Sequence, residues 1–365
     1  MIVTRNINDI EFDIDVQEAN EVYFEEEDYK KTNGGDLNAI LNMFYEKKQE
    51  IVPLVLTWEL TNKCNFQCPF CYINVKENVN KAEEYYKLKE IKSEIDKFVK
   101  EGLFIVNLTG GECLMHPEFS SIYKYLKKKG VLVAIYTNAA LVKEEHLKLF
   151  SDYKPYKIEV SIYGTTTTFS QGEKRKIATT VLNNIIRLKA LGINIVAKMP
   201  YNSATASQYM EVSLWCKHNN IEFYSSDELF LRYDTTDTSM YKMQLNDVNI
   251  EEKISMEIGY KKVFDCPAGK YSFLLTYDRY VRPCFALYKS LAEEWNYSID
   301  RDGMWVAYEY MKAHIEREKG KILRYCRGCY AKNMCQECIA TQCLANNVEE
   351  YMRRRCDMLK NIYRK

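Results

Sequence analysis

Six apolar stretches of strand length alternate with helix-like stretches between residues 51 and 224, and this alternation constrains the fold more than any other feature of the chain. Strands that alternate with helices predict parallel β-α-β units. Strands are predicted at 52–58, 104–108, 131–136, 157–162, 193–199 and 221–224, and helices at 82–100, 118–129, 143–150, 174–191 and 207–219. Because the strands read as apolar on both faces, and six units are too few for a closed eight-stranded barrel, the sequence predicts an open, six-unit partial barrel covered on its outer face.

The predicted fold class is therefore α/β, and segments of different composition flank the barrel. The first of them is acidic, with weak strand-like alternation at 2–3 and 10–14 and helical spacing at 37–48. It is interpreted either as a solvated extension or as a candidate peptide-docking element. The predicted boundaries are 1–50 for this N-terminal extension, 51–225 for the core, 226–265 for a polar linker and 266–365 for a cysteine-rich domain, with a hairpin at 271–284 and a helix at 305–319.

Composition excludes several classes of protein. Hydrophobic residues make up 47% and charged residues 28% of the 365 positions, values typical of a soluble globular chain. The 51 basic residues balance 51 acidic ones, which argues against a nucleic acid or an anionic membrane surface as partner. No apolar run approaches the roughly 20 residues that cross a bilayer. The start of the chain also lacks the basic and apolar regions of a secretory signal, so a cytoplasmic protein is predicted.

Thirteen cysteines are too many for packing alone, and in a cytoplasmic chain they indicate metal or cluster ligation rather than disulfides. Cys64, Cys68 and Cys71 are spaced C-x3-C-x2-C directly after the first predicted strand, at the end where barrel enzymes place their sites. Three thiolates on one loop can hold three irons of a [4Fe–4S] cube and leave the fourth iron open. An open iron takes an exogenous ligand and therefore indicates catalysis. The alternative is a zinc knuckle or incidental cysteines.

Phe70 completes the pattern C-x3-C-x-Φ-C, which resembles the signature of the radical S-adenosylmethionine (radical SAM) superfamily. The resemblance implies that the open iron binds S-adenosyl-L-methionine (SAM) and that its reductive cleavage yields a 5′-deoxyadenosyl radical, with the protein positioning the cofactor and excluding water. It also implies SAM contacts at Phe70, Gly110, Gly111, Glu112, Asn138, Ser161 and Lys198. The alternatives are an ordinary turn at 110–112, core packing of Phe70 and a solvated Lys198.

A second cysteine cluster lies between residues 266 and 356 and resembles the SPASM extension, which holds two auxiliary [4Fe–4S] clusters in many peptide-modifying radical SAM enzymes. The last gap and one additional cysteine depart from the family pattern. The resemblance implies an outer cluster on Cys326, Cys329, Cys335 and Cys356, and an inner cluster on Cys266, Cys284 and Cys338, with Cys343 as a candidate fourth ligand. A single zinc ion or a single cluster is the alternative.

Two cysteines and four histidines remain outside these groups. Cys216 lies in a predicted helix and is interpreted as a core residue. Cys113 follows the glycine pair and is interpreted mainly as a structural residue, with hydrogen donation to a substrate radical as the alternative. The histidines are scattered without metal-ligand spacing, so packing or surface positions are predicted for them.

The resemblance covers roughly residues 51–360, and the segment Ser161-Ile-Tyr163-Gly164 is more similar to maturases of ribosomally made peptides than to sulfatase maturases. It implies an oxidoreductase that abstracts hydrogen from a precursor peptide and installs a thioether or a C–C or C–O cross-link. The implied partners are that peptide and a flavodoxin- or ferredoxin-type reductant. The alternatives are a peptide epimerase, an anaerobic sulfatase maturase and an iron–sulfur electron carrier without turnover.

Overall fold

The computed structural model describes residues 2–7, 10–15, 17, 21–24, 32–33, 53–73, 85–170, 172–226, 229, 232, 239–241, 267–287 and 297–323. The chain forms two compact units. The first unit comprises Met1–Met243 and Leu275–Asp278, and the second comprises Gln244–Leu274 and Arg279–Lys365.

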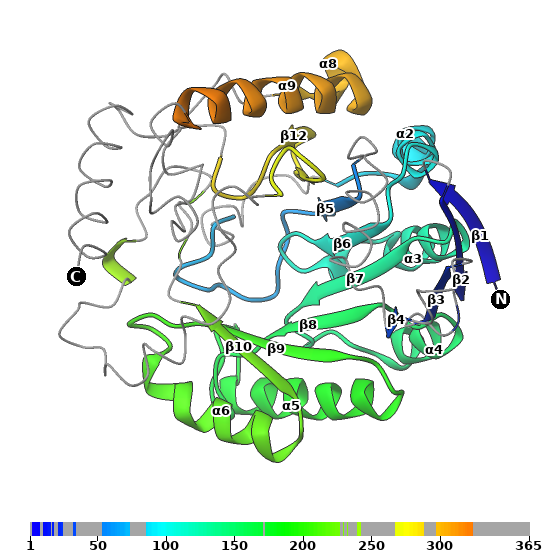
Figure 1. Ribbon diagram of the computed structural model, residues 1–365. Coiled ribbons are helices and arrows are strands. Elements are labelled where there is room, and N and C mark those ends of the chain that lie inside the picture. The colour runs from blue at the N-terminus through cyan, green and yellow to red at the C-terminus, as the bar shows by residue number, and fades with distance from the viewer. Residues whose placement is uncertain are drawn as a thin grey trace, which may run out of the picture. The chain divides into compact units, whose positions relative to one another are not determined.

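Six parallel strands form the centre of the first unit, in the spatial order β10-β9-β8-β7-β6-β5 (Figure 1). Their bounds are β5 Val55–Glu59, β6 Ile105–Thr109, β7 Leu132–Thr137, β8 Lys157–Ser161, β9 Ile195–Pro200 and β10 Glu222–Ser226. The connecting helices are α2 Leu88–Lys100, α3 Phe119–Lys128, α4 Glu144–Asp152, α5 Lys174–Ala190 and α6 Tyr209–His218, with short 3-10 turns at Cys113–Met115 and Ala206–Gln208. The predicted α/β class and open, six-stranded parallel sheet are confirmed.

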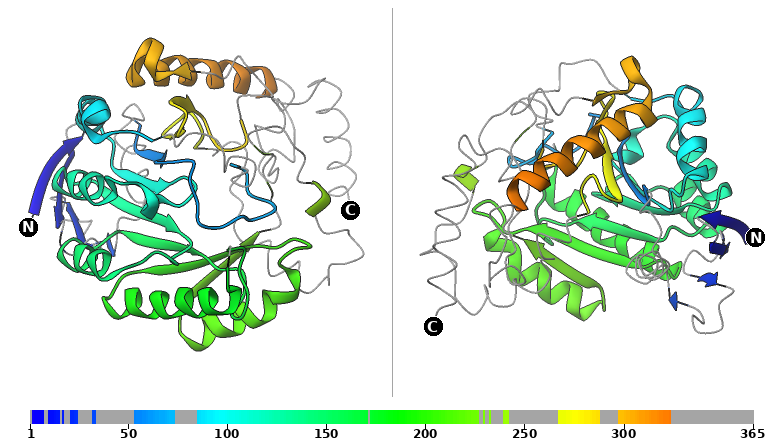
Figure 2. Two further views of the ribbon diagram at one scale, coloured as in Figure 1. Left: turned by 180° about the vertical axis from the view of Figure 1, so that it is seen from behind. Right: turned by 45° about the horizontal axis from the view of Figure 1, so that its top comes forward.

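The helices cover one face of this sheet, as the views in Figures 1 and 2 agree. Side chains alternate between the faces of a strand, so Leu56 and Trp58 of β5 point to the same side, and both are fully buried. On α2, Ile91, Ile95 and Phe98 are buried at helical spacing, which gives the helix one apolar stripe against the sheet. The outer face of the sheet and the inward stripes of the helices therefore form the main core.

The opposite face of the sheet is polar, which corrects the expectation of strands that are apolar on both faces. Thr57 pairs in register with Asn107, and the Asn107 amide donates a hydrogen bond of 3.2 Å to the Thr57 hydroxyl. One layer further along the strands, Glu59 is in register with Thr109, and on the neighbouring strands Tyr136 is in register with Glu159. The sequence did not reveal this alternation, because each strand is short and contributes only two or three polar positions to an otherwise apolar run.

The N-terminal extension forms an antiparallel sheet of four strands in the order β1-β2-β3-β4. Their bounds are β1 Ile2–Ile7, β2 Ile10–Asp15, β3 Glu21–Phe24 and β4 Thr32–Asn33. The two predicted strand segments are confirmed as parts of β1 and β2. The last two strands were not predicted, because acidic residues around them mask the pattern. The helix predicted at 37–48 lies outside the described residues.

The buried Arg5 side chain attaches this N-terminal sheet to the amino ends of the parallel strands. Its guanidinium donates hydrogen bonds to the carbonyls of Val99, at 2.7 Å, and Gly130, at 3.4 Å. It also lies 5.9 Å from the centre of the Phe104 ring. Val99 precedes β6 and Gly130 precedes β7, so the extension contacts the end of the barrel opposite to the carboxyl ends of the strands.

The second unit contains β12 Tyr280–Arg282, β13 Tyr297–Ser298, α8 Ile299–Asp302 and α9 Met304–Leu323, together with most of β11 Ser272–Leu275. The predicted hairpin is present: β11 and β12 are neighbours, and Arg279 occupies the turn at φ +70°. The predicted helix is present as α9. None of the helices in the described part of the chain is both long and apolar enough to cross a membrane.

Candidate active site at the carboxyl ends of the strands

Cys64, Cys68 and Cys71 lie in the loop after β5, half-buried and not joined in disulfides. Burial raises the pKa of the Cys64 thiol, and the Glu112 carboxylate and the other two thiols raise it further. Burial and Cys71 likewise raise the pKa of Cys68. Thiols that disfavour one another's ionisation are stabilised as thiolates by a shared cationic centre, so this donor set fits an iron–sulfur cluster.

Hydrogen-bond donors point at two of the three sulfurs. The Phe66 backbone N–H lies 3.3 Å from the Cys64 Sγ, and the Asn138 amide nitrogen lies 3.8 Å from it. The Tyr163 hydroxyl donates to the Cys68 Sγ. Donors of this kind orient thiolate ligands and stabilise their charge, so the surroundings of the loop also fit cluster ligation.

Gly110 and Gly111 allow the turn after β6 to lie directly against the cysteine-bearing loop. The Gly111 N–H donates to the Thr61 carbonyl at 2.8 Å, and the Glu112 N–H to the Lys63 carbonyl at 2.7 Å. A Cβ on Gly111 would lie 2.2 Å from the Lys63 carbonyl oxygen, and Gly110 has φ +128°. The two glycines thus serve the packing of two backbone segments. Their predicted contact with SAM remains a prediction.

The Glu112 carboxylate is buried, at 1% exposure, and connects the ends of β6 and β7. It accepts hydrogen bonds from the Thr137 hydroxyl at 2.7 Å, the Asn138 N–H at 2.8 Å and the Leu114 N–H at 3.1 Å. Burial raises the pKa of Glu112, and these donors offset part of the rise. The side chain therefore positions the turn, and its predicted contact with SAM remains a prediction.

Asn138 follows β7 and reaches the cysteine-bearing loop from the side. Its amide donates to the Asn65 side-chain oxygen at 2.8 Å, and its own oxygen accepts from the Ala140 N–H at 3.0 Å. Asn65 was not singled out in the sequence, although it stands directly after Cys64. The pair fixes the loop between its first two cysteines.

Phe70 belongs to an aromatic cluster that closes over the loop. Its ring lies 5.7 Å from Tyr163, 5.3 Å from Phe169 and 6.4 Å from Tyr241, each edge-on. The Gln67 N–H also donates to the Phe169 carbonyl at 2.8 Å. The residues after β8 thus pack against the loop and give Phe70 a packing role. The predicted contact of Phe70 with SAM remains a prediction.

Ser161 and Lys198 are adjacent in register at the ends of β8 and β9. The Ser161 hydroxyl hydrogen-bonds to the Tyr163 side chain. Lys198 forms an ion pair with the buried Glu159 carboxylate, and its ammonium lies 5.6 Å and 5.4 Å from the Tyr136 and Tyr224 ring centres. The Lys198 side chain is 41% exposed, so it borders the polar face of the sheet. Its predicted contact with SAM remains a prediction.

Two further chains of polar contacts on this face were missed in the sequence. Glu159 also pairs with Lys157 at 2.6 Å and accepts a hydrogen bond from the Tyr136 hydroxyl. Thr109 and the fully buried Glu59 both hydrogen-bond to the Tyr72 hydroxyl, next to Cys71. The signal was present in the alternation of polar residues within β5, β6 and β8.

The two isolated cysteines are both buried. The Cys113 thiol donates to the Tyr136 carbonyl at 3.3 Å, and burial raises its pKa. It is enclosed at 0% exposure, which favours the structural interpretation over hydrogen donation. Cys216 is buried on α6, as predicted.

Of the eight C-terminal cysteines only Cys284 is described, and its side chain is half-buried. The other predicted auxiliary-cluster ligands, Cys266, Cys326, Cys329, Cys335, Cys338, Cys343 and Cys356, lie outside the described residues.

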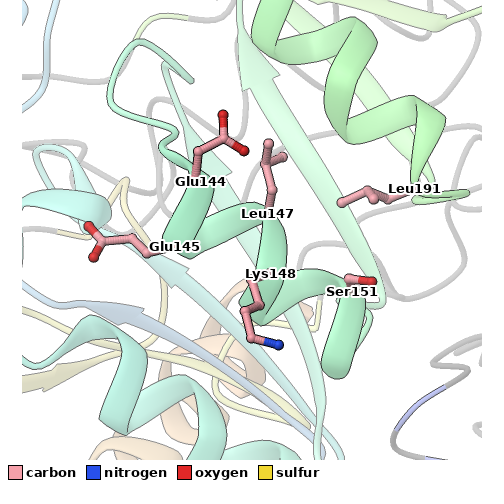
Figure 3. A pocket seen from close by; sticks show the side chains of 6 residues that line it. All are labelled: Glu144, Glu145, Leu147, Lys148, Ser151 and Leu191. Carbon is pink, nitrogen blue, oxygen red and sulfur yellow. The ribbon is translucent and has the colours of Figure 1, made fainter.

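Two surface pockets in the described part of the first unit contain none of the three clustered cysteines. One is a shallow hollow along α4, where Glu144, Leu147 and Lys148 face the end of α5 near Leu191 (Figure 3). The other, of about 410 Å³, lies beside the turn after β6 and is lined by Leu114, Met115, His116, Pro117, Phe119, Ser120, Leu141, Lys143, Glu145 and His146. Neither contains the donor set of the cysteine-bearing loop.

Comparison with known proteins finds a match to the model of the Radical SAM superfamily over residues 58–201. The antilisterial bacteriocin subtilosin biosynthesis protein AlbA of Bacillus subtilis (strain 168) is 36% identical over 111 residues, which is 30% of this chain and 24% of AlbA. The sporulation killing factor maturation protein SkfB of the same organism is 24% identical over 256 residues, 64% of this chain and 60% of SkfB. The aligned regions thus span less than two thirds of either relative.

A similar fold occurs in the crystal structure of Streptococcus suis SuiB bound to S-adenosylmethionine. The two structures superpose with a TM-score of 0.59 over 86% of this chain and 80% of SuiB, at 14% sequence identity. At that identity the likeness shows a shared fold.

Proposed function

We propose that the protein is a radical SAM peptide maturase, which abstracts hydrogen from a ribosomally made precursor peptide and installs a thioether or a C–C or C–O cross-link. The proposal starts from the match of residues 58–201 to the model of the Radical SAM superfamily. A [4Fe–4S] cluster with SAM bound at its open iron supplies the 5′-deoxyadenosyl radical for this chemistry. AlbA and SkfB are named for the biosynthesis of a bacteriocin and the maturation of a killing factor, which supports a peptide as substrate.

The observation that carries the proposal is the polar inner face beside the cysteine-bearing loop. It presents the Lys157–Glu159–Lys198 ion pairs and the Tyr136 hydroxyl along three neighbouring strands. A peptide carries amide groups and side chains of both charges, so it needs hydrogen-bond donors, acceptors and both signs of charge along its path. An apolar lining would instead favour a small hydrophobic substrate.

We further propose that the C-terminal cysteines hold two auxiliary [4Fe–4S] clusters, distributed as the sequence predicts. Each cross-link removes two hydrogens from the peptide, one as a hydrogen atom and the other as a proton and an electron. The auxiliary clusters are the proposed acceptors of that electron, and a flavodoxin- or ferredoxin-type protein is the proposed reductant. Cysteine-ligated clusters require a reducing compartment, so a cytoplasmic location belongs to the proposal.

The domain boundaries at 50, 225 and 265 and the peptide-docking role of residues 1–50 belong to the same proposal. Support comes from the N-terminal sheet, which is a separate antiparallel element with its own strand order. An antiparallel sheet with an open edge offers backbone groups to an extended chain.

The test is anaerobic co-expression of the full chain with the short peptide encoded beside its gene, followed by the intact mass and fragmentation of the peptide. Loss of two hydrogens per modified site, with fragments missing between the joined residues, is the expected result. The control is the triple variant Cys64→Ala, Cys68→Ala, Cys71→Ala, which should neither cleave SAM nor alter the peptide.

Each other outcome selects an alternative. An unchanged mass in light water with deuterium gained in heavy water would show epimerisation. A new aldehyde on one serine or cysteine would show formylglycine formation. Cleavage of SAM with the peptide unaltered would overturn the neighbouring peptide as substrate, and absence of SAM cleavage by the reduced protein would favour an electron carrier.

A further inference from the structure

Tyr163 stands two residues after β8, and its hydroxyl reaches a cysteine of the loop that follows β5. Two hydrogen bonds meet at this oxygen. The Ser161 hydroxyl donates to it, and it donates in turn to the Cys68 Sγ. A relay of three side chains therefore runs from the end of β8 to one of the predicted cluster ligands.

The Tyr163 ring is held in place by neighbours on several sides. Phe169 lies at 5.0 Å, Phe70 at 5.7 Å and Phe66 at 6.4 Å between ring centres. Phe66 and Phe70 belong to the cysteine-bearing loop itself, so loop and ring are packed together. A phenol fixed in this way keeps its hydroxyl on the sulfur at little cost in entropy.

Backbone contacts tie the same two segments together. Phe66 forms an antiparallel bridge with Ser170, and the Gln67 N–H donates to the Phe169 carbonyl at 2.8 Å. A Cβ on Gly164 would lie 2.9 Å from the Thr167 methyl group and 3.0 Å from its carbonyl oxygen. The segment after Tyr163 therefore turns tightly, and this turn returns the chain to the loop.

We propose that Tyr163 is a positioning residue that sets the reduction potential of the open-iron cluster through its hydrogen bond to Cys68. The inference rests on the proposed function, since it requires that Cys64, Cys68 and Cys71 hold that cluster. Reduction adds an electron and makes the sulfurs more negative. A hydrogen bond to a ligand sulfur is stronger in the reduced state, so it raises the potential. Without the hydroxyl, the cluster is harder to reduce.

The experiment is an anaerobic redox titration of the reconstituted full-length protein, followed by electron paramagnetic resonance without SAM. The signal to follow is the one whose shape changes when SAM is added to a parallel sample, because that change identifies the cluster with the open iron. Tyr163→Phe removes the hydroxyl and keeps the ring. The expected result is a tenfold lower equilibrium constant for reduction, a shift of about 59 mV to more negative potential for one electron.

Tyr123→Phe is the matched control. Tyr123 is also buried, and its hydroxyl donates to the Tyr153 carbonyl at 2.7 Å on the outer side of the sheet. This variant makes the same chemical change and loses a comparable buried hydrogen bond, so it should leave the potential unchanged. An equal shift of the potential in both variants would overturn the inference, because it would show that any lost buried hydrogen bond changes the potential.

Ser161→Ala is the second variant, used where Tyr163→Phe retains too little cluster to titrate. It removes the donor to the Tyr163 oxygen and weakens the bond to Cys68, so a smaller shift in the same direction is expected. An unchanged potential in Tyr163→Phe, or in Ser161→Ala where that variant is the one titrated, overturns the inference and leaves the proposed function intact. Wild-type protein without an open-iron signal after reconstitution would instead overturn the proposed function.

Discussion

Buried charged side chains at the two ends of the parallel strands differ in how well they are hydrogen-bonded. At the carboxyl ends, the Glu112 carboxylate accepts hydrogen bonds from the Thr137 hydroxyl and the backbone of Leu114 and Asn138. At the amino ends, the Lys127 ammonium on α3 is fully buried near Asp15 of the N-terminal sheet and has no hydrogen-bond partner among the described residues. The first arrangement fixes a geometry, whereas the second carries an electrostatic cost that the surrounding packing must offset.

The difference indicates which end is organised for chemistry. The Glu112 N–H and the Asn138 side chain both hydrogen-bond to the cysteine-bearing loop, so a change around Glu112 should move the proposed ligands. Changes around Lys127 and Arg5 affect how the N-terminal sheet is attached and leave the loop in place. Stability and cluster content should therefore respond separately to mutations at the two ends.

The largest effect is expected for Gly111→Ala at the carboxyl end. The new Cβ would lie 2.2 Å from the Lys63 oxygen and 2.6 Å from the Lys63 carbonyl carbon, and backbone cannot move aside as a flexible side chain can. Destabilisation of about 3 kcal/mol or more is expected, with iron content after reconstitution reduced at least several-fold. Iron analysis and urea unfolding measure both.

The control for that variant is Gly320→Ala on α9, where the added Cβ meets nothing within 4 Å. Alanine is favoured over glycine inside a helix by roughly 0.5–1 kcal/mol, so the same substitution should be neutral or stabilising there. Normal iron binding by Gly111→Ala would contradict the close packing of the two backbone segments.

Glu112→Ala should have the next largest effect, because it leaves the Thr137 hydroxyl and two backbone N–H groups without their buried acceptor. A loss of about 2–4 kcal/mol is expected, together with weaker cluster retention. The control is Glu173→Gln, because Glu173 is exposed and its substitution should change neither stability nor cluster retention. Unfolding in urea and the visible absorbance of the reconstituted protein are the measurements. A variant that lost stability but kept its full cluster would contradict the statement that Glu112 positions the cysteine-bearing loop.

Lys127→Met tests the amino end, and its effect should depend on pH. Burial lowers the pKa of Lys127 to about 7 in the folded protein, whereas in the unfolded chain it is about 10.4. The folded state therefore binds fewer protons between these values, and wild-type stability should rise as pH increases from 7 to 10.

Methionine keeps the apolar stem and removes the charge, so Lys127→Met should be more stable than wild type by roughly 2–4 kcal/mol at pH 7 and nearly equal to it at pH 10. Urea unfolding at both pH values checks this. The same difference at both values would show that the ammonium is not what the fold disfavours. Cluster content should stay at the wild-type level.

Arg5→Ala should give the smallest effect of the series. It removes two hydrogen bonds to backbone carbonyls and the contact with the Phe104 ring. Local opening of the N-terminal sheet should become about tenfold more frequent, or about 1.4 kcal/mol easier, as measured by hydrogen exchange of β1 and β2. Arg5→Lys should fall in between, because an ammonium cannot span both carbonyls. Unchanged exchange would show that Arg5 does not attach the sheet.

The sequence allowed the parallel strands and their helices to be predicted within a few residues, because each apolar run is short and bounded by polar turns. The three clustered cysteines could also be predicted, since one loop contains all of them. Both signals are local. The strand β3 was missed for the opposite reason, as its pairing with β2 stabilises a segment whose own composition is acidic.

The finer parts of the site depend on contacts between distant residues. Nothing near Tyr163 in the sequence indicates that its hydroxyl reaches Cys68, and nothing near Glu159 indicates that Lys198 pairs with it. These partners are set by the register of β8 and β9 and by the return of the chain after Gly164. Motif spacing therefore locates a site, whereas strand register decides which side chains meet there.

The pairing of the turn after β6 with the cysteine-bearing loop has a consequence for the placement of the cysteines. The bonds from Gly111 to Thr61 and from Glu112 to Lys63 extend the ladder of β5 and β6 beyond the strands. The approach to Cys64 is thus shaped by the same backbone pairing that builds the sheet, so the register of two strands also fixes where the first cysteine of the loop lies.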